Sequence, residues 1–432
     1  MSIRERIVGS AEAAGSKLGG SVGTVRDRID EVAIPWVPKR EGVANPREYA
    51  LIVGAVTLLV SFGVVMVYSA SSARTGLQLP IRTFVIGLLL GVPVCVLASR
   101  LDLDRIRALA PVMLMGAGVL LLLVPLIGFS VNGAKRWLGV GLFSFQPSEL
   151  AKVAIVVFLS SRLLSARSSL QSISGTLRIT MWPVLAIVAL IATEPDMGTA
   201  IVCVVTTFLM YILAGTPARV LGPIIVGLGC IGSTLALSSS YQRARLTTFL
   251  DPGANPTGAG FQSLQGQIAI GSGGITGVGP GQSVQKIFYL PEAQTDFILA
   301  VIGEELGLIA LLGLLACFGV IMVCGFRVAA KATHPFAKLL AAGTTALVTT
   351  QAMLNMCVVL GIAPLTGVPL PFISYGPTNL VVLLAAVGLL LNVAADGGVR
   401  LRAIDGEGER NESADRSRWD SRPRSASAQR RG

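Results

Sequence analysis

The stretch at residues 279–307 reads GPGQSVQKIFYLPEAQTDFILAVIGEELG, and it leads from a polar, glycine-rich loop directly into a long apolar helix. Thr295 is the predicted N-cap, which places Asp296 in the first turn, where the helix dipole favours a carboxylate. Glu304 and Glu305 follow roughly 12 to 14 Å further along the axis, near the middle of a hydrocarbon core about 30 Å thick. Carboxyls at that depth are costly, so we expect them either to pair or to tune a site.

The composition indicates the class of protein. Of the 432 residues, 52% are hydrophobic and 14% are charged, and the mean hydropathy is +0.71. These values exclude an ordinary soluble globule and predict a polytopic membrane protein. The net charge of +11 is spread over loops and tails without an aromatic and basic patch, which argues against nucleic-acid binding. The six cysteines lie in apolar stretches without a C-x-x-C pair, so we expect packing residues.

Ten apolar segments are long enough to cross a bilayer, so the predicted fold class is all-α. Their approximate spans are 49–69, 80–99, 108–127, 147–163, 178–194, 197–215, 219–239, 297–326, 337–361 and 377–395. The membrane domain is thus predicted at 49–395. It follows a polar tail at 1–48 and precedes a tail at 396–432, which alternates Arg with Asp and Glu and should be disordered.

The distribution of positive charge predicts the orientation in the membrane. The loops after segments two, four, six and eight are basic, whereas the short loops after segments five and nine contain no Lys or Arg. The basic residues are Arg100, Arg105, Arg107, Arg162, Arg167, Arg178, Arg219, Arg327, Lys331 and Lys338. Because basic loops stay inside, both termini are predicted to be cytoplasmic. The large loop at 238–295 then faces outward, and loops of that length are usually functional.

A polar island separates the third and fourth segments. Pro147 suits a first helical position, Glu149 lies in the first turn, and Lys152 follows at i+3 on the same face. Two readings stay open. Glu149 and Lys152 form a local ion pair, or Lys152 joins Lys135 and Arg136 in a cationic site for a phosphorylated lipid head group.

Further polar stretches interrupt the apolar pattern. The carboxylates of 193–199 could simply be solvated, and 364–379 places four prolines around Ser374 and Tyr375. The glycines of the outer loop follow no strand and lack a G-K-[ST] pattern, so we expect turns rather than a nucleotide site. The single histidine, His334, is expected to face solvent, which excludes a histidine triad or a zinc site.

Several motifs follow one another in a distinctive order. They are Arg136-Trp137, Gln146-Pro-Ser-Glu149, Pro195-Asp-Met-Gly-Thr199, Tyr289 to Gly307, and Pro369-Leu-Pro-Phe-Ile-Ser-Tyr-Gly376. With these motifs the chain resembles, over roughly 49–395, the SEDS family of peptidoglycan polymerases, which comprises FtsW and its elongation and sporulation relatives. Gln285-Lys286 and Tyr289–Ala293 are more similar to the FtsW branch than to RodA. Two positions depart from the family: Gln294 replaces a usual His, and Pro377–Asn379 replace Gly-Ser-Ser.

The resemblance implies a glycosyltransferase that joins lipid II into glycan strands at the outer face of the cytoplasmic membrane. By family match Asp296 is the catalytic base, with plain helix capping as the alternative. The departing undecaprenyl pyrophosphate needs cations, and the candidates are Lys135, Arg136, Lys152, Arg243, Arg245 and Lys286. A divalent ion, Mg or Mn, could assist, but its ligands are unknown. The supporting residues are Gln146, Glu149, Asp196, Glu292, Glu304, Glu305, Ser374 and Tyr375.

Other functions fit some of the same features. Ten helices with intramembrane carboxylates also describe a lipid II flippase, although the sequence contains no clear inverted repeat. A non-catalytic scaffold is a third reading. Within the family, elongation of the RodA type is the alternative to septal synthesis in cell division. The implied partners are a cognate class B penicillin-binding protein, divisome proteins and membrane lipid.

Overall fold

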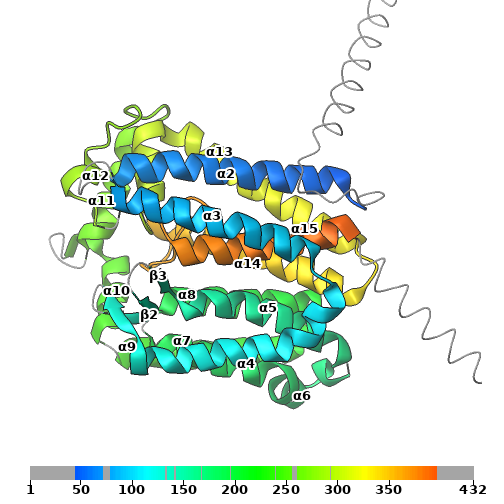
Figure 1. The fold of residues 1–432 in the computed structure, drawn as a ribbon. Helices are drawn as coiled ribbons and strands as arrows, with labels where there is room; N and C mark the ends of the chain where they lie inside the picture. The colour runs from blue at the N-terminus through cyan, green and yellow to red at the C-terminus, as the bar shows by residue number, and fades with distance from the viewer. Residues whose placement is uncertain are drawn as a thin grey trace, which may run out of the picture. The chain divides into compact units, whose positions relative to one another are not determined.

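The computed structural model describes residues 44–396, apart from 72–77, 132–133, 141–142, 167, 195, 239, 255–259 and 292. Long helices dominate this part of the chain and run side by side (Figure 1). They are α2 (Pro46–Ser71), α3 (Gln78–Arg100), α4 (Leu103–Ile127), α5 (Pro147–Ser165), α7 (Trp182–Thr193), α8 (Met197–Leu213), α9 (Ala218–Ser238), α13 (Ile298–Lys331), α14 (Pro335–Val359) and α15 (Pro377–Asp396). The predicted tails lie outside the described residues, except for 44–48 and 396.

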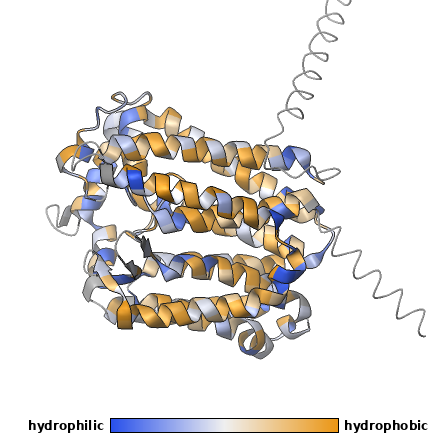
Figure 2. Cartoon of the chain, viewed as in Figure 1, coloured by the Kyte–Doolittle hydropathy of each residue, from blue (hydrophilic) through white to orange (hydrophobic). Residues whose placement is uncertain are grey.

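Each of the ten apolar segments predicted from the sequence coincides with a helix. The segment at 178–194 combines a π-helical turn, η2 (Thr176–Met181), with α7. Seven helices of the described chain are long and apolar enough to cross a membrane, and α8 and α9 carry shorter apolar stretches. Figure 2 shows hydrophobic residues along the length of these helices. The chain is therefore an all-α, multi-pass membrane protein, and the number of ten crossings stays a prediction.

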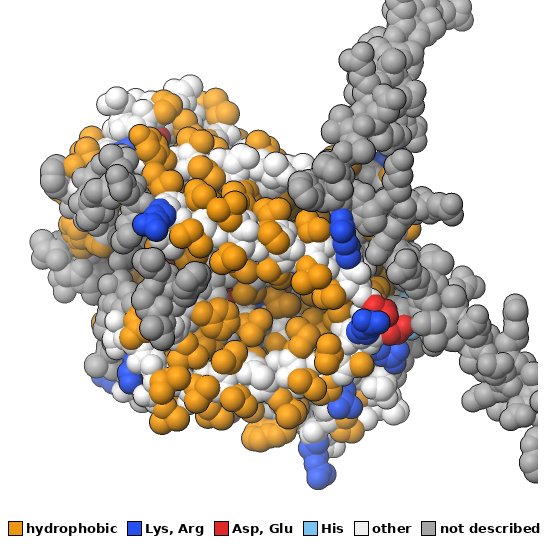
Figure 3. Space-filling view, in the orientation of Figure 1, with side chains coloured by type: hydrophobic (Ala, Val, Ile, Leu, Met, Phe, Trp, Pro, Cys, Tyr) orange, Lys and Arg blue, Asp and Glu red, His pale blue; other side chains and the backbone are white. Residues whose placement is uncertain are grey.

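Helix α14 lies at the centre of the bundle, where it packs against α13, α15, α5 and α8. The apolar windows of α14 and α15 are 78% and 83% buried, whereas those of α3 and α13 are only 22% buried. On the face drawn in Figure 3, hydrophobic side chains cover the middle of the bundle, with Lys and Arg toward its ends. Such an apolar outer surface suits contact with lipid, because each helix satisfies its own backbone.

A small antiparallel sheet follows α4. Its strands are β1 (Phe129–Val131), β2 (Ala134–Val140) and β3 (Phe143–Phe145), in the order β1-β2-β3. Phe129 lies opposite Trp137, and Leu138 lies opposite Phe145. The sequence analysis did not predict these strands, because runs this short carry little periodicity. The sheet holds the first half of the polar island against the end of α4 and the start of α5.

The predicted outer loop is largely helical. It contains α10 (Ser240–Leu250), the turn η3 (Pro252–Ala254), α11 (Phe261–Gly273) and α12 (Gln285–Phe288), and α11 packs along α13. We call the end of the bundle that carries the sheet and α10–α12 the loop end (Figure 1). Helices α2, α4 and α14 end there, and α5, α8, α13 and α15 begin there, so any polar group at these termini belongs to one region.

At the opposite end, His334 caps α14. Its ring is buried, with 8% exposed, and Nδ1 accepts a hydrogen bond of 3.2 Å from the backbone N–H of Phe336. The prediction that His334 faces solvent is wrong, because the cap turns the ring over the first turn of the helix. Nearby, Lys331 on α13 forms an ion pair with Glu48 on α2. All six cysteines are free thiols; Cys203 and Cys324 are buried, whereas Cys230 is exposed and does not pack inside the bundle.

Candidate active site

Asp296 lies in a turn at the loop end, directly before α13. The helix begins at Ile298, and its N-cap is Phe297, without a side-chain capping bond. The prediction that Thr295 caps the helix and that Asp296 lies in its first turn is therefore wrong. Thr295 instead donates its hydroxyl to Oδ1 of Asp296 at 3.2 Å. The Asp296 carboxylate is half-buried and stands outside the helix that was predicted to hold it.

Two elements surround this turn. On α14, Nδ2 of Asn355 donates to the carbonyl oxygens of Asp296 and Val368, each at 2.8 Å. The loop between α14 and α15 passes on the other side, where a Cβ added at Gly367 would lie 3.8 Å from Oδ2 of Asp296. The absence of a side chain at Gly367, which has φ +72°, leaves room beside the carboxylate.

A buried ion pair joins α5 to α14 and α15. Nζ of Lys152 lies 2.8 Å from Oε2 of Glu149 and donates to Oε1 of Gln351 at 2.7 Å. Nδ2 of Asn379 donates to Oε2 of Glu149 at 2.6 Å. Pro147 occupies the first helical position, as predicted, and Glu149 and Lys152 form the local ion pair, which was one of the two readings left open. The ammonium of Lys152 is 1% exposed, and its charge is balanced by a carboxylate.

The acids of the 193–199 stretch are buried rather than solvated, so that expectation is wrong. Oδ2 of Asp196 accepts hydrogen bonds of 2.9 Å from both Gln146 and Ser148, and Oδ1 accepts one from the N–H of Thr199. Glu194 is 4% exposed, and neither of its carboxylate oxygens has a hydrogen-bond partner among the described residues. Asp196 thereby ties the start of α8 to the start of α5.

Arg136 adjoins this acidic pair from the sheet. Its Nε donates to the carbonyl oxygen of Glu194 at 3.1 Å. Burial raises the pKa of the Glu194 carboxyl to about 8; the charge of Asp196 acts in the same direction, and the guanidinium of Arg136 opposes it. The surroundings of Glu194 therefore favour its neutral form.

A second buried ion pair connects α12 to α13 and α2. Nζ of Lys286 lies 2.6 Å from Oε1 of Glu305 and donates to the hydroxyl of Ser69 at 2.9 Å. The hydroxyl of Ser69 in turn lies within hydrogen-bond distance of Glu305. Glu304 accepts from the hydroxyl of Ser283 and the N–H of Val284. These contacts favour buried pairing as the role of both glutamates.

The depth predicted for Glu304 and Glu305 is wrong because α13 is kinked. Gly307 has φ +70° and ψ −166°, so the helix is interrupted there. Residues 308–331 rise about 36 Å, which alone suffices to cross a hydrocarbon core of about 30 Å. The partner of Glu305, Ser69, lies two residues before the end of α2. Both carboxylates therefore lie at the loop end and not at mid-span.

The remaining predicted residues are distributed around the loop end. Lys135 is exposed and donates to the carbonyl oxygen of Pro125. Arg243 is exposed and donates to the carbonyl oxygen of Leu237. Arg245 is half-buried and bonds the carbonyl of Leu365 at 3.0 Å. The structure brings none of these three side chains into the buried ion pairs.

Two supporting residues lie in the loop before α15. Ser374 is buried, and its hydroxyl accepts from the N–H of Leu370 at 2.8 Å. The N–H of Tyr375 donates to the carbonyl oxygen of Gln294, which holds this loop to the Asp296 turn. Glu292 lies outside the described residues. Within the described ranges, no group of three or more His, Cys, Asp or Glu side chains could hold a metal ion, and a metal requirement stays a prediction.

Sequence reasoning missed several polar residues inside apolar helices. Gln351 and Asn355, both buried, lie one turn apart on α14 and hold the adjacent carbonyls of Pro369 and Val368. An amide pair at i and i+4 in an otherwise apolar helix was the available signal, because a buried amide requires partners. Ser69 near the end of α2 carried no such signal.

The fold and the site define a class: a multi-pass membrane protein with a half-buried carboxylate flanked by two buried ion pairs at one end of its bundle. A family model described as "Cell cycle protein", covering FtsW, RodA and SpoVE, matches residues 49–397. The chain belongs to this family.

Named relatives match along most of the chain. A probable peptidoglycan glycosyltransferase FtsW from Geobacter metallireducens is 40% identical over 344 residues, which cover 78% of this chain and 92% of the relative. Stage V sporulation protein E from Bacillus subtilis is 37% identical over 355 residues, covering 80% and 96%.

Solved structures are similar as well. One belongs to a study of the structural coordination of polymerization and crosslinking by a peptidoglycan synthase complex; its TM-score is 0.68 at 28% identity, covering 80% of this chain and 97% of that one. RodA from Thermus thermophilus has a TM-score of 0.59 at 26% identity, covering 80% and 96%.

Proposed function

We propose that this protein is a peptidoglycan glycosyltransferase that polymerises lipid II into glycan strands, in the septal branch of the family. The observation that carries the proposal is the half-buried Asp296 carboxylate, held at the loop end beside an open glycine position. Relatives named as peptidoglycan glycosyltransferases are 37–40% identical over most of the chain, which supports the same reaction here.

Asp296 acts as the general base in this reaction. It takes the proton from the acceptor sugar hydroxyl, while that oxygen forms a bond to the anomeric carbon of the donor. The bond between the anomeric carbon and the pyrophosphate oxygen breaks, and undecaprenyl pyrophosphate leaves with the electron pair. A carboxylate at a membrane boundary suits this role, since the lipid tails of both substrates are in the membrane while their sugars are in water.

Positive charge must stabilise the leaving pyrophosphate. Arg136 and Arg245 are the first candidates, because both are half-buried at the loop end, where their guanidinium groups donate to the carbonyl oxygens of Glu194 and Leu365. Lys135 and Arg243 are exposed and can reach incoming substrate. Lys152 and Lys286 contribute only if substrate loosens their ion pairs, since each already faces a buried glutamate.

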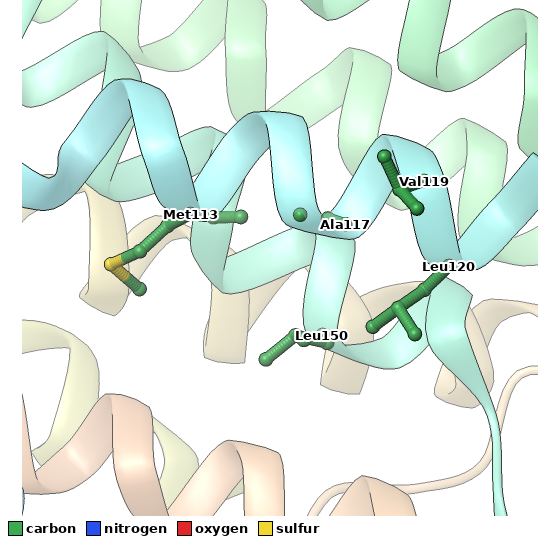
Figure 4. A pocket seen from close by; sticks show the side chains of 7 residues that line it. Met113, Ala117, Val119, Leu120 and Leu150 are labelled. Carbon is green, nitrogen blue, oxygen red and sulfur yellow. The ribbon is translucent and has the colours of Figure 1, made fainter.

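The lipid tail of the substrate needs an apolar path, and a groove between α4 and α5 fits it (Figure 4). The groove has a volume of about 470 Å³ and is lined by Met113, Gly116, Ala117, Val119, Leu120, Leu150 and Ala154. Leu150 lies in the first turn of α5, so the groove reaches the part of α5 that is near the loop end. A polyprenyl chain bound there would keep its pyrophosphate at the loop end.

The reaction takes place at the outer face of the cytoplasmic membrane, with both termini cytoplasmic. The basic loops identified in the sequence support this orientation, because they belong to the end opposite the loop end. A cognate class B penicillin-binding protein is the expected partner for crosslinking, and divisome proteins and membrane lipid are further contacts. The similarity to a solved synthase complex that couples polymerization to crosslinking supports such a partner.

Purified protein in vesicles with labelled lipid II tests this function against a flippase. We expect glycan strands, resolved by gel electrophoresis, when lipid II is accessible to the outward-facing loop end. Transfer of lipid II between leaflets without any polymer would overturn the proposal and support transport.

A further inference from the structure

Asn355 hydrogen-bonds the main chain of the turn that carries Asp296. Its Nδ2 donates to the carbonyl oxygens of Asp296 and Val368, both at 2.8 Å, and the side chain is 1% exposed. Asp296 precedes α13, whereas Val368 belongs to the loop before α15. One amide group therefore joins two segments that are far apart in sequence.

The position of Asp296 depends on such contacts because its own helix does not fix it. The N-cap of α13 has no side-chain capping bond, and Asp296 lies outside the helical hydrogen-bond ladder. The loop that carries Val368 also places Gly367 beside the Asp296 carboxylate. The two carbonyls held by Asn355 thus set the distance between the acid and the loop that borders it.

The neighbouring turn of α14 extends this arrangement to the buried ion pair on α5. Nε2 of Gln351 donates to the carbonyl oxygen of Pro369 at 3.0 Å, and its Oε1 accepts from Lys152. Pro369 follows Val368 in the chain, so two amides one turn apart hold adjacent carbonyls of a single loop. Helix α14 therefore contacts both the turn that carries Asp296 and the ion pair of Lys152, and it holds the two in place relative to each other.

We infer that Asn355 is a positioning residue for the proposed reaction: it holds the Asp296 turn at a fixed distance from the Val368 loop. The inference rests on the proposed function, since it assigns Asn355 an effect on the step that Asp296 performs. Asn355 does not touch substrate in this account. Its loss should lower kcat and leave KM for lipid II nearly unchanged, because a small misplacement of a base can reduce the rate about 100-fold.

Asn392 on α15 provides a matched control. Its Nδ2 also donates to two carbonyl oxygens, those of Ala98 at 3.0 Å and Leu101 at 2.6 Å, and it is also 1% exposed. In both asparagines, Oδ1 is buried and has no hydrogen-bond partner in the part of the chain that the structure describes. Asn392 lies far from the loop end, near the end of α3. The same substitution removes two hydrogen bonds to backbone carbonyls at each position. Only at Asn355 does one of these carbonyls belong to Asp296.

The test compares Asn355→Asp with Asn392→Asp in the full-length protein, at equal amounts of folded protein in detergent. We expect comparable decreases in Tm, a loss of kcat of about 10- to 100-fold only in Asn355→Asp, and less than a two-fold change in KM. A carboxylate at 355 repels both carbonyls but donates one hydrogen bond when protonated. The kcat ratio of Asn355→Asp to wild type should therefore rise as the pH falls from 8 to 6.

Equal losses of kcat in the two variants, or wild-type kcat in folded Asn355→Asp, would overturn the inference. If Asn355→Asp does not fold, Asn355→Ser replaces it. The serine hydroxyl can still bond one of the two carbonyls, so a smaller kcat loss with unchanged KM is expected, and an unchanged kcat would overturn the inference. Failure of the proposed function has a different signature, because wild-type protein would then form no strands from lipid II.

Discussion

Glu194 illustrates what burial does to a single carboxyl. The residue is 4% exposed, has no hydrogen-bond partner for either oxygen among the described residues, and lies close enough to Asp196 to be affected by its charge. Burial raises its pKa from the ordinary value of 4.5 to about 8. The charged form is therefore costly in the folded state, and stability must depend on pH.

The sign of that dependence follows from the direction of the shift. Below pH 4.5 the carboxyl is protonated in both states and costs nothing. Between about 4.5 and 8 the unfolded state ionises while the folded state keeps its proton, so the free energy of unfolding falls as the pH rises. Above pH 8 the loss is complete.

Replacing this residue isolates the effect. Glu194→Gln cannot ionise, so its Tm in detergent should exceed that of wild type by an amount that grows between pH 6 and pH 8 and then stays constant. Asp102→Asn, at an exposed N-cap where asparagine serves equally well, is the control and should leave the pH dependence unchanged. If the plots of Tm against pH for Glu194→Gln and wild type are parallel, the pKa of Glu194 is not raised in the folded protein.

At the scale of elements, the ion pair of Lys286 and Glu305 holds the outer loop against the helix bundle. It holds α12 to α13 and, through Ser69, to α2. Removing one charge leaves the other buried and unpaired, at a cost of about 3–5 kcal/mol, whereas removing both costs much less. Lys286→Met should therefore lower Tm strongly, and Lys286→Met combined with Glu305→Leu should recover most of that loss.

The outcome that contradicts this interpretation is additivity. If the double variant loses the sum of the two single effects, the residues do not form a pair in solution. Lys135→Met is the control, because the ammonium of Lys135 is exposed and donates to the carbonyl of Pro125, so its loss should cost little.

The helices were predictable from sequence because bilayer crossing requires long apolar runs, and all ten segments coincide with helices. The i+3 pair of Glu149 and Lys152 was also predictable, since it is local. The kink at Gly307 was not predictable from the sequence. Its φ of +70° is required by close approach to Gly277 and Ile275, where an added Cβ would lie 2.4 Å from backbone atoms. That contact is long-range, so the depth of Glu305 was misjudged.

The candidate site, like the fold, was only partly predictable from the sequence. The motifs identified Asp296 and the acids around it, but partners such as Asn355, Gln351 and Asn379 come from helices distant in sequence. Lys286 looked like a free cation in the sequence, because nothing local shows that it faces Glu305 on another helix. Burial of a charge is decided by the fold and not by its neighbours in the chain.

At the scale of the whole molecule, the groove between α4 and α5 should accommodate the lipid tail. Nothing lies within 4 Å of a Cβ added at Gly116, so Gly116→Leu can fold while filling the groove. Displacing part of the chain from apolar contact costs about 1–3 kcal/mol, so KM for lipid II should rise roughly ten-fold with little change in kcat.

Two comparisons make this prediction specific. Gly54→Leu, on α2, is the control, because a Cβ at Gly54 also meets nothing within 4 Å. A substrate with a short lipid tail should show no difference between Gly116→Leu and wild type. An unchanged KM for full-length lipid II in Gly116→Leu would show that the tail binds elsewhere.

The most direct measurement of the central claim is the initial rate of glycan polymerisation by Asp296→Asn. The amide keeps the shape of the side chain but cannot take a proton, so the rate should fall by about 10²- to 10⁴-fold. Asp102→Asn, the same change at the opposite end of the bundle, should polymerise at the wild-type rate. Polymerisation by folded Asp296→Asn at the wild-type rate would contradict the assignment of Asp296 as the base.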